Sequence, residues 1–182
     1  MIAKALGYQK IRPEVFISEP FKDAYEISKA FTMTSLARMT CLWQASDWLN
    51  ANGIEGDFIE CGVWKGGSSM LMAQNLLLHP NVKRNLHLYD TFEGMTEPTS
   101  HDVDFKGQSA EELMRSASGR KKEATIWAYA QLSEVKKNIA MTNFPSEQVH
   151  YHVGKVEETI SNPPLHDQIA LLRLDTDWYS ST

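Results

Sequence analysis

A glycine-rich turn constrains the fold of this chain more than any other feature. Residues 57–69 read DFIECGVWKGGSS, in which strand-forming residues lead into three glycines and two serines. Glycine lets the backbone turn tightly and come close to a ligand, and Ser68 is a favourable helix N-cap. The segment predicts a strand over about 57–61, a turn, and a helix over about 68–79. In an open parallel sheet such a turn lies at the carboxyl end of its strand, where ligands bind.

Strands and helices alternate along the rest of the chain. Hydrophobic patterns predict further helices over 34–52 and 121–141, and further strands over about 85–89, 148–153 and 169–174. Alternation of this kind is typical of a parallel sheet with right-handed crossovers. We therefore expect an α/β, Rossmann-like fold whose parallel sheet has the strand order 3-2-1-4.

The length of 182 residues fits one domain over residues 1–182. Residues 1–33 are expected to form an N-terminal arm, and the polar stretch over 96–120 a lid-like loop, because a loop this long in a compact domain is either functional or disordered. The strand over 169–174 is rich in Leu and Ile, as interior strands are. With nothing after it, one apolar edge would be open. We therefore expect the last strands of the sheet to be missing and the chain to form a homo-oligomer.

Composition narrows the possible partners. The net charge is −5, whereas a protein that binds duplex nucleic acid needs a basic face. No apolar run is long enough to span a bilayer, and the N-terminus has no apolar signal core. Cys41 and Cys61 suggest neither a disulfide framework nor a zinc site. These features favour a cytoplasmic protein that binds neither nucleic acid nor membrane.

Acidic residues lie at the ends of three of the predicted strands, at Glu60, Asp90 and Asp175. Because parallel strands end at one edge of the sheet, we expect these acids to line a single crevice. Asp90 follows Gly66 by 24 residues, close to the spacing at which an acid binds ribose hydroxyls in βαβ cofactor sites. The glycine spacing differs from the dinucleotide fingerprint, and Trp64 would crowd a pyrophosphate. A smaller cofactor such as S-adenosylmethionine fits better. The alternative is that the glycines serve only helix–sheet packing.

Three phrases resemble the macrocin O-methyltransferase family: ECGVWKGGS over 60–68, LYDTFEGM over 88–95 and LRLDTDWY over 172–179. The first also looks like the first motif of catechol-type O-methyltransferases. The similarity runs from about residue 31 to residue 182. It implies an S-adenosylmethionine-dependent, metal-assisted O-methyltransferase that acts on a hydroxyl of a sugar or other natural product, so that the partner is a small-molecule hydroxyl acceptor. Family members continue with further strands and a later acidic pair, so the resemblance implies a chain truncated at its C-terminus.

The resemblance also implies residue roles. The methionine end of the cofactor would be bound by Glu60, Gly62, Ser68 and Ser69, with Gly66 in the same cofactor-binding set. Asp90 would bind the ribose hydroxyls, with Thr91 and Phe92 beside the adenosine. The adenine would be bordered by Gly154, Lys155 and Val156, and Met33–Ser35 would cover the cofactor. Asp175 and Asp177 would be the catalytic residues and the metal ligands.

The Asp175-x-Asp177 pair also allows a chemical argument for a metal. A hard cation that binds the hydroxyl oxygen lowers the hydroxyl pKa and fixes the oxygen against the methyl group. Mg²⁺ uses one or two carboxylates plus water, which these residues could supply. A solvated turn is the alternative for this pair alone. Two other functions stay open: a nucleotide-sugar glycosyltransferase with an Asp-x-Asp metal site, and a non-catalytic cofactor-binding fragment.

Overall fold

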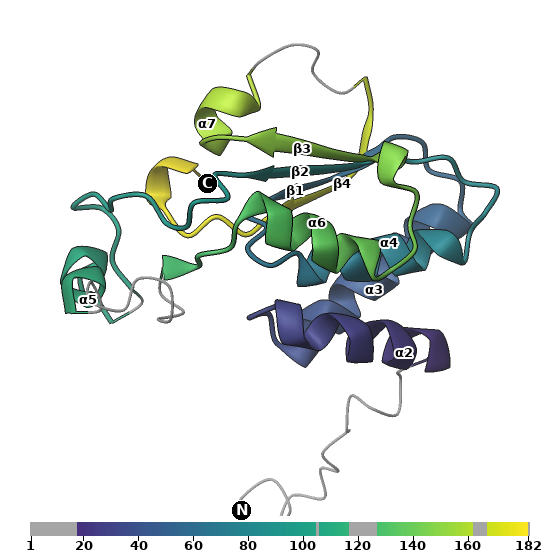
Figure 1. Cartoon of the computed structure of the whole chain (residues 1–182), viewed down its shortest axis with the longest axis horizontal. Helices are drawn as coiled ribbons and strands as arrows, with labels where there is room; N and C mark the ends of the chain where they lie inside the picture. The colour runs from purple at the N-terminus through teal and green to yellow at the C-terminus, as the bar shows by residue number, and fades with distance from the viewer. Residues whose placement is uncertain (1–17, 105, 117–126, 162–166, 182) are drawn as a thin grey trace, which may run out of the picture.

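The computed structural model describes residues 18–104, 106–116, 127–161 and 167–181. Its centre is a four-stranded parallel sheet with the order β3-β2-β1-β4 (Figure 1). The strands are β1 (Asp57–Cys61), β2 (Leu86–Asp90), β3 (Val149–Val153) and β4 (Ile169–Leu174). The predicted order is confirmed, and every predicted strand boundary lies within one residue of the observed one.

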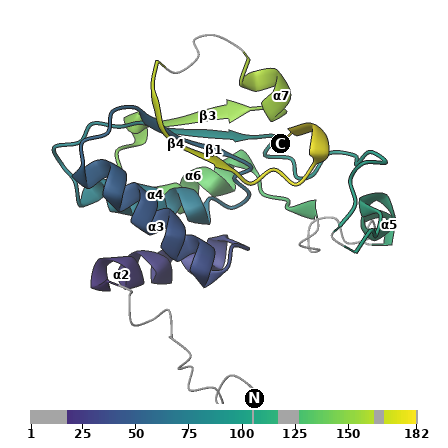
Figure 2. The same cartoon turned by 180° about the vertical axis from the view of Figure 1, so that it is seen from behind.

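Most of the helices cover one face of this sheet (Figures 1 and 2). They are α2 (Glu19–Ser28), α3 (Leu36–Ala51), α4 (Gly67–Leu77) and α6 (Leu132–Ala140). The short helix α7 (Val156–Thr159) lies against the opposite face, and α5 (Ala110–Ser116) lies beyond the carboxyl ends of the strands. Single turns of 3-10 helix occupy Lys29–Phe31 (η2), Ser146–Gln148 (η5) and Tyr179–Ser181 (η6).

The core lies between the sheet and α4. Phe58, Leu86 and Leu88 of the strands are fully buried against Met70 and Met72 of α4. Helix α4 is buried on nearly all sides, because α2 and α3 pack on it from outside. This packing explains why its sequence is apolar all round. The buried α4 fixes the glycine-rich turn that precedes it.

One predicted helix needs correction, and the structure adds detail to the expected arm and lid. Residues 127–131, which the sequence predicts to be helical, belong to no α-helix. The carbonyl of Trp127 accepts a hydrogen bond from the amide of Met95 (2.8 Å), so this segment contacts the loop after β2 instead. Residues 121–126 of the same predicted helix lie outside the described part of the chain. Residues 19–31 of the expected arm are helical and pack on α4. Residues 1–17 lie outside the described part of the chain. The expected lid contains α5, with residues 105 and 117–120 not described.

The N-cap of α4 is also different from the prediction. Gly66, and not Ser68, is the N-cap, and it has φ 88°, a left-handed conformation that glycine adopts without steric cost. The helix therefore begins at Gly67. Ser68 and Ser69 consequently lie within its first turn and are buried.

Two further observations bear on the expectations about membranes and assembly. In the described ranges, no helix combines the length and the apolar character needed to cross a bilayer. Within the same ranges β4 is an edge strand, and Ile169, Leu172 and Leu174 are each close to half exposed. The expected homo-oligomer stays a prediction.

Candidate cofactor-binding site

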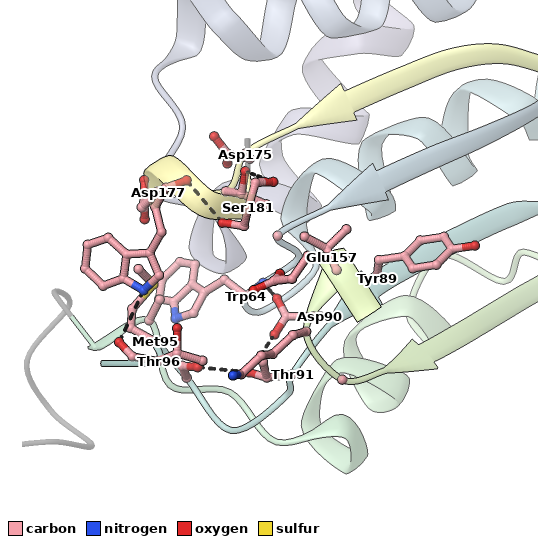
Figure 3. A pocket seen from close by; sticks show the side chains of 18 of the residues that line it. Trp64, Tyr89, Asp90, Thr91, Met95, Thr96, Glu157, Asp175, Asp177 and Ser181 are labelled. Carbon is pink, nitrogen blue, oxygen red and sulfur yellow. Dashed lines mark hydrogen bonds between the residues drawn. The ribbon is translucent and has the colours of Figure 1, made fainter. Parts of the chain in front are cut away.

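A cleft opens at the carboxyl ends of the four strands (Figure 3). Each strand contributes residues from its end or from the loop that follows it. The lining residues include Gly62 and Trp64 after β1, Asp90, Thr91 and Gly94 to Thr96 at the end of and after β2, Gly154 to Glu157 after β3, and Asp175 to Trp178 after β4. Met33, which precedes α3, lines the same cleft. Segments far apart in the sequence therefore meet at the sheet edge where parallel α/β proteins bind ligands.

Gly62 joins the turn after β1 to the end of β4. Its φ is 84°. A Cβ atom at this position would overlap the carbonyl oxygen of Asp175. The amide of Asp175 donates to the carbonyl of Cys61 at 2.8 Å, and the amide of Gly62 donates to Tyr89 at 2.9 Å. Only glycine allows this close contact between the two strand ends.

Asp90 organises the same turn. Its Oδ2 accepts the backbone amides of Val63 (2.6 Å) and Trp64 (3.1 Å), and its Oδ1 accepts the amide of Phe92 (2.8 Å). The hydroxyl of Thr91 also lies 3.5 Å from Oδ1, but its single proton has a shorter bond to the carbonyl of Gly94 at 2.9 Å. A carboxylate oxygen has two lone pairs, so Oδ1 keeps acceptor capacity on a side chain that lines the cleft. Asp90 can thus hold the turn and still accept a hydrogen bond from a ligand.

Glu60 lies beneath the cleft and does not line it, contrary to expectation. Its side chain is 1% exposed and points toward α4, where it meets Ser69. The hydroxyl of Ser69 donates to its Oε2, and the guanidinium of Arg173 contacts its Oε1 at 2.6 Å. Burial raises the pKa of Glu60 to about 7, although attraction by Arg173 and the hydrogen bond from Ser69 oppose the rise.

Arg173 is a site residue that sequence reasoning missed. It lies beside Glu60 in the β1–β4 register, and its Nη2 donates to Asp175 (2.8 Å) and to Thr34 (3.0 Å). A signal was present in the sequence: a charge among the leucines of a strand needs a buried partner. The partner lies 113 residues away, so the sequence did not reveal it.

Asp175 and Asp177 both line the cleft, as well as a second cavity beside it. Burial, and then the nearby charge of Asp175, raise the pKa of Asp177. The second cavity is also bordered by Arg38 and by Asp102, which accepts hydrogen bonds from Thr99 and from the amide of Tyr179. Within the described residues, no three His, Cys, Asp or Glu side chains are grouped so that they could hold a metal ion.

The structure brings together part of the expected site. The expected residues that line the cleft are Gly62, Asp90, Thr91, Gly154, Lys155, Val156, Asp175 and Asp177. Met33 lines it as well, and Thr34 borders only the second cavity. Those absent from its lining are Glu60, Gly66, Ser68, Ser69 and Phe92.

The absences have local causes. The first turn of α4 faces the protein interior: Ser68 Oγ is 3.7 Å from Met39 Sδ, and Ser69 bonds to Glu60. Gly66 packs against Val135 and Ile139 of α6. Phe92 adopts φ 55°, which turns its ring into the core near Tyr151.

The sheet order and the cleft at the strand ends define a Rossmann-like α/β fold of the class I methyltransferase type. Within that class the chain belongs to the family described as "Macrocin-O-methyltransferase (TylF)", whose model matches residues 20–182. This membership does not support the glycosyltransferase that the Asp-x-Asp pair alone left open.

Two curated relatives come from Streptomyces. One is the 8-demethyl-8-(2,3-dimethoxy-alpha-L-rhamnosyl)-tetracenomycin-C 4'-O-methyltransferase of Streptomyces olivaceus, 33% identical over 85% of this chain and 55% of the relative. The other is the demethyldecarbamoylnovobiocin O-methyltransferase of Streptomyces niveus, 30% identical over 85% of this chain and 55% of the relative. The chain thus spans about half the length of these relatives.

Solved structures agree with this fold. The O-methyltransferase NovP is similar with a TM-score of 0.65 and 29% identity, over 83% of this chain and 58% of NovP. The calicheamicin methyltransferase CalS11 is similar with a TM-score of 0.57 over 97% of this chain and 72% of CalS11. The latter shares 15% identity, so it supports the fold alone.

Proposed function

We propose that this chain is the cofactor-binding part of an S-adenosylmethionine-dependent O-methyltransferase that acts on a hydroxyl of a sugar or other natural product. The observation that carries the proposal is the cleft, in which Gly62, Asp90 and Asp175 meet from three strand ends. The names of the relatives support this acceptor class, since both are O-methyltransferases and one is named for a substrate that carries a rhamnosyl group. We also propose a cytoplasmic location, since Cys41 and Cys61 are both free thiols.

The residues of the cleft suit the proposed cofactor, which when bound supplies an electrophilic methyl group on a sulfonium. The remaining acceptor capacity of Asp90 Oδ1 suits a ribose hydroxyl, and Gly154–Val156 would border the adenine. The acidic wall at Asp175 favours the positive charge of the cofactor's amino-acid end. Asp175 or Asp177 would accept the proton of the acceptor hydroxyl. Catalysis would then depend mainly on orienting that hydroxyl for in-line transfer.

Binding of S-adenosylhomocysteine to the 182-residue chain tests this function. Titration calorimetry should detect binding of S-adenosylhomocysteine to the chain and should detect no binding of uridine diphosphate. Absence of S-adenosylhomocysteine binding by a folded chain would refute the proposal, and preferential binding of the nucleoside diphosphate would point to glycosyl transfer.

Magnesium assistance is a separable part of the proposal. Asp175 and Asp177 supply the one or two carboxylates that Mg²⁺ uses in proteins, so they fit part of a site. When bound, the cation would polarise the acceptor hydroxyl. Arg173 already contacts Asp175 Oδ2 at 2.8 Å, so Asp177 would be the more available ligand.

Asp177→Asn should therefore weaken Mg²⁺ binding by about tenfold or more, because it removes one of two candidate anionic ligands. Calorimetry with MgCl₂ measures this directly. Asp104→Asn, which changes an acid that borders only the second cavity, serves as the control. If the wild-type chain binds no Mg²⁺, or if both variants bind it equally well, these residues do not hold a metal in this chain.

Asp90→Ala should weaken S-adenosylhomocysteine binding by about 2 kcal/mol, since it removes a charged acceptor. Loss of the three amide bonds to the turn would also weaken binding, so the experiment must separate the two roles. A 2′,3′-dideoxy analogue of S-adenosylhomocysteine provides the control. The wild-type chain should prefer the ligand with the hydroxyls, and the variant should bind both ligands equally. A preference that survives in Asp90→Ala would show that another group binds the ribose.

A further inference from the structure

Arg173 connects a buried acid to the wall of the cleft. Its guanidinium contacts three oxygens from three separate segments: Glu60 of β1 (2.6 Å), Asp175 after β4 (2.8 Å) and Thr34 before α3 (3.0 Å). The side chain of Arg173 is 14% exposed, that of Glu60 1% and that of Asp175 45%. The cation therefore spans the distance from the interior to the cleft surface.

The contacts fix the guanidinium from below. Ser69 holds one oxygen of Glu60 and Arg173 Nη1 contacts the other, so neither Glu60 nor Nη1 is free to rotate. The planar fork then directs Nη2 at Asp175 and Thr34. Among the described residues, Asp175 is bound through Oδ2 only, which leaves its Oδ1 available for other partners. Met33, the neighbour of Thr34, lines both cavities.

We propose that Arg173 is a positioning residue, which fixes the carboxylate of Asp175 and the Thr34 segment against buried Glu60 so that the cleft is preformed for its cofactor. This inference rests on the proposed function, and it gives Glu60 a role different from the one the sequence suggested. Glu60 acts as the anchor of Arg173 and does not contact the ligand itself. A guanidinium suits this role because one lysine ammonium lacks the rigid fork that joins three oxygens.

A purely structural role is the competing explanation, in which Arg173 only neutralises Glu60. Three variants separate the two roles. Arg173→Met removes the cation and nearly keeps the length of the side chain, Arg173→Lys keeps the charge without the fork, and Arg173→Met combined with Glu60→Gln removes both buried charges. Arg115→Met, at an exposed arginine in α5, is the matched control.

Thermal unfolding and calorimetric binding of S-adenosylhomocysteine should respond differently to these variants, because stability should recover in the double variant whereas affinity should not. At pH 8, where the carboxyl of Glu60 is ionised in the folded chain, Arg173→Met should lower the unfolding temperature by about 10 °C, because the buried carboxylate loses its partner. The double variant should regain most of that loss, since removing both partners is nearly neutral. Binding should nevertheless stay about ten- to a hundredfold weaker in all three variants. Arg115→Met should match the wild type in both measurements.

The inference is overturned if the double variant regains wild-type affinity, or if Arg173→Lys binds as the wild type does. A second cycle checks the route through Asp175. In a chain that carries Asp175→Asn, adding Arg173→Met should cost less than about threefold further affinity, and an additive loss would contradict that route. Failure of the wild-type chain to bind S-adenosylhomocysteine would refute the proposed function, whereas wild-type binding with unaffected variants would refute only the role of Arg173.

Discussion

Replacing Gly62 by alanine should destabilise the chain by about 4 kcal/mol and abolish measurable cofactor binding. Two effects add. The left-handed conformation at φ 84° costs any residue with a Cβ about 1 to 2 kcal/mol. The new methyl group would also overlap the carbonyl oxygen of Asp175, so the turn after β1 and the end of β4 must move apart. Urea unfolding and calorimetry with S-adenosylhomocysteine measure the two losses.

Gly53→Ala is the matched control for this experiment. Gly53 also has a positive φ, of 63°, but no atom lies within 4 Å of the position that its Cβ would take. It should therefore show the conformational cost alone, about 1 to 2 kcal/mol, with unchanged binding. If Gly62→Ala is no less stable than Gly53→Ala, the close approach of the two strand ends does not control the cleft.

The sheet could be predicted because its signals are local. Each strand is a short apolar run that ends at an acid or a glycine, so both the boundaries and the order follow from alternation with helices. Asp90 and Asp175 line the cleft for the same reason, because each lies at or just after the carboxyl end of a strand. The carboxyl end of a parallel strand is a defined place in the fold. The position of a residue at that end can therefore be predicted without knowing its long-range contacts.

The direction of Glu60 could not be predicted in this way. Strand residues alternate between the two faces of a sheet, but both faces of β1 are buried, as its residues from Phe58 to Cys61 show. Hydrophobicity therefore does not indicate which face Glu60 is on. What settles its direction is Arg173, which lies far away in the sequence and becomes a neighbour only through the β1–β4 register.

The place of Phe92 away from the cleft lining and the wrong helix boundary at residues 127–131 have a similar origin. Phe92 follows a strand and looks like a residue beside the ligand, but its positive φ turns the ring into the core. Trp127 and Leu132 fit a helical pattern, yet the carbonyl of Trp127 accepts a hydrogen bond from Met95. At Phe92 a single dihedral angle thus overrides the local pattern, and at residues 127–131 a nonlocal backbone contact does so.

The free energy of unfolding should fall by about 2 to 3 kcal/mol between pH 5 and pH 8 through Glu60 alone. The pKa of this carboxyl is about 7 in the folded chain, against an ordinary value of 4.5, chiefly because the group is buried. Between these values the folded chain holds a proton that the unfolded chain has released. The stabilisation is therefore complete below pH 4.5 and is lost as the pH rises through 7.

Glu60→Gln isolates this contribution, because glutamine has the shape of the protonated acid and cannot titrate. Groups with lowered pKa values, such as Asp57 and Asp102, act in the opposite direction at low pH, so only the difference between wild type and variant is informative. Urea unfolding at pH 5 and pH 8 should show that the wild type loses about 2 to 3 kcal/mol more than Glu60→Gln. The same substitution at exposed Glu93 controls for the change in net charge. Equal pH dependence in wild type and Glu60→Gln would mean that Arg173 keeps Glu60 ionised throughout, and attraction by Arg173 would then outweigh the cost of burial.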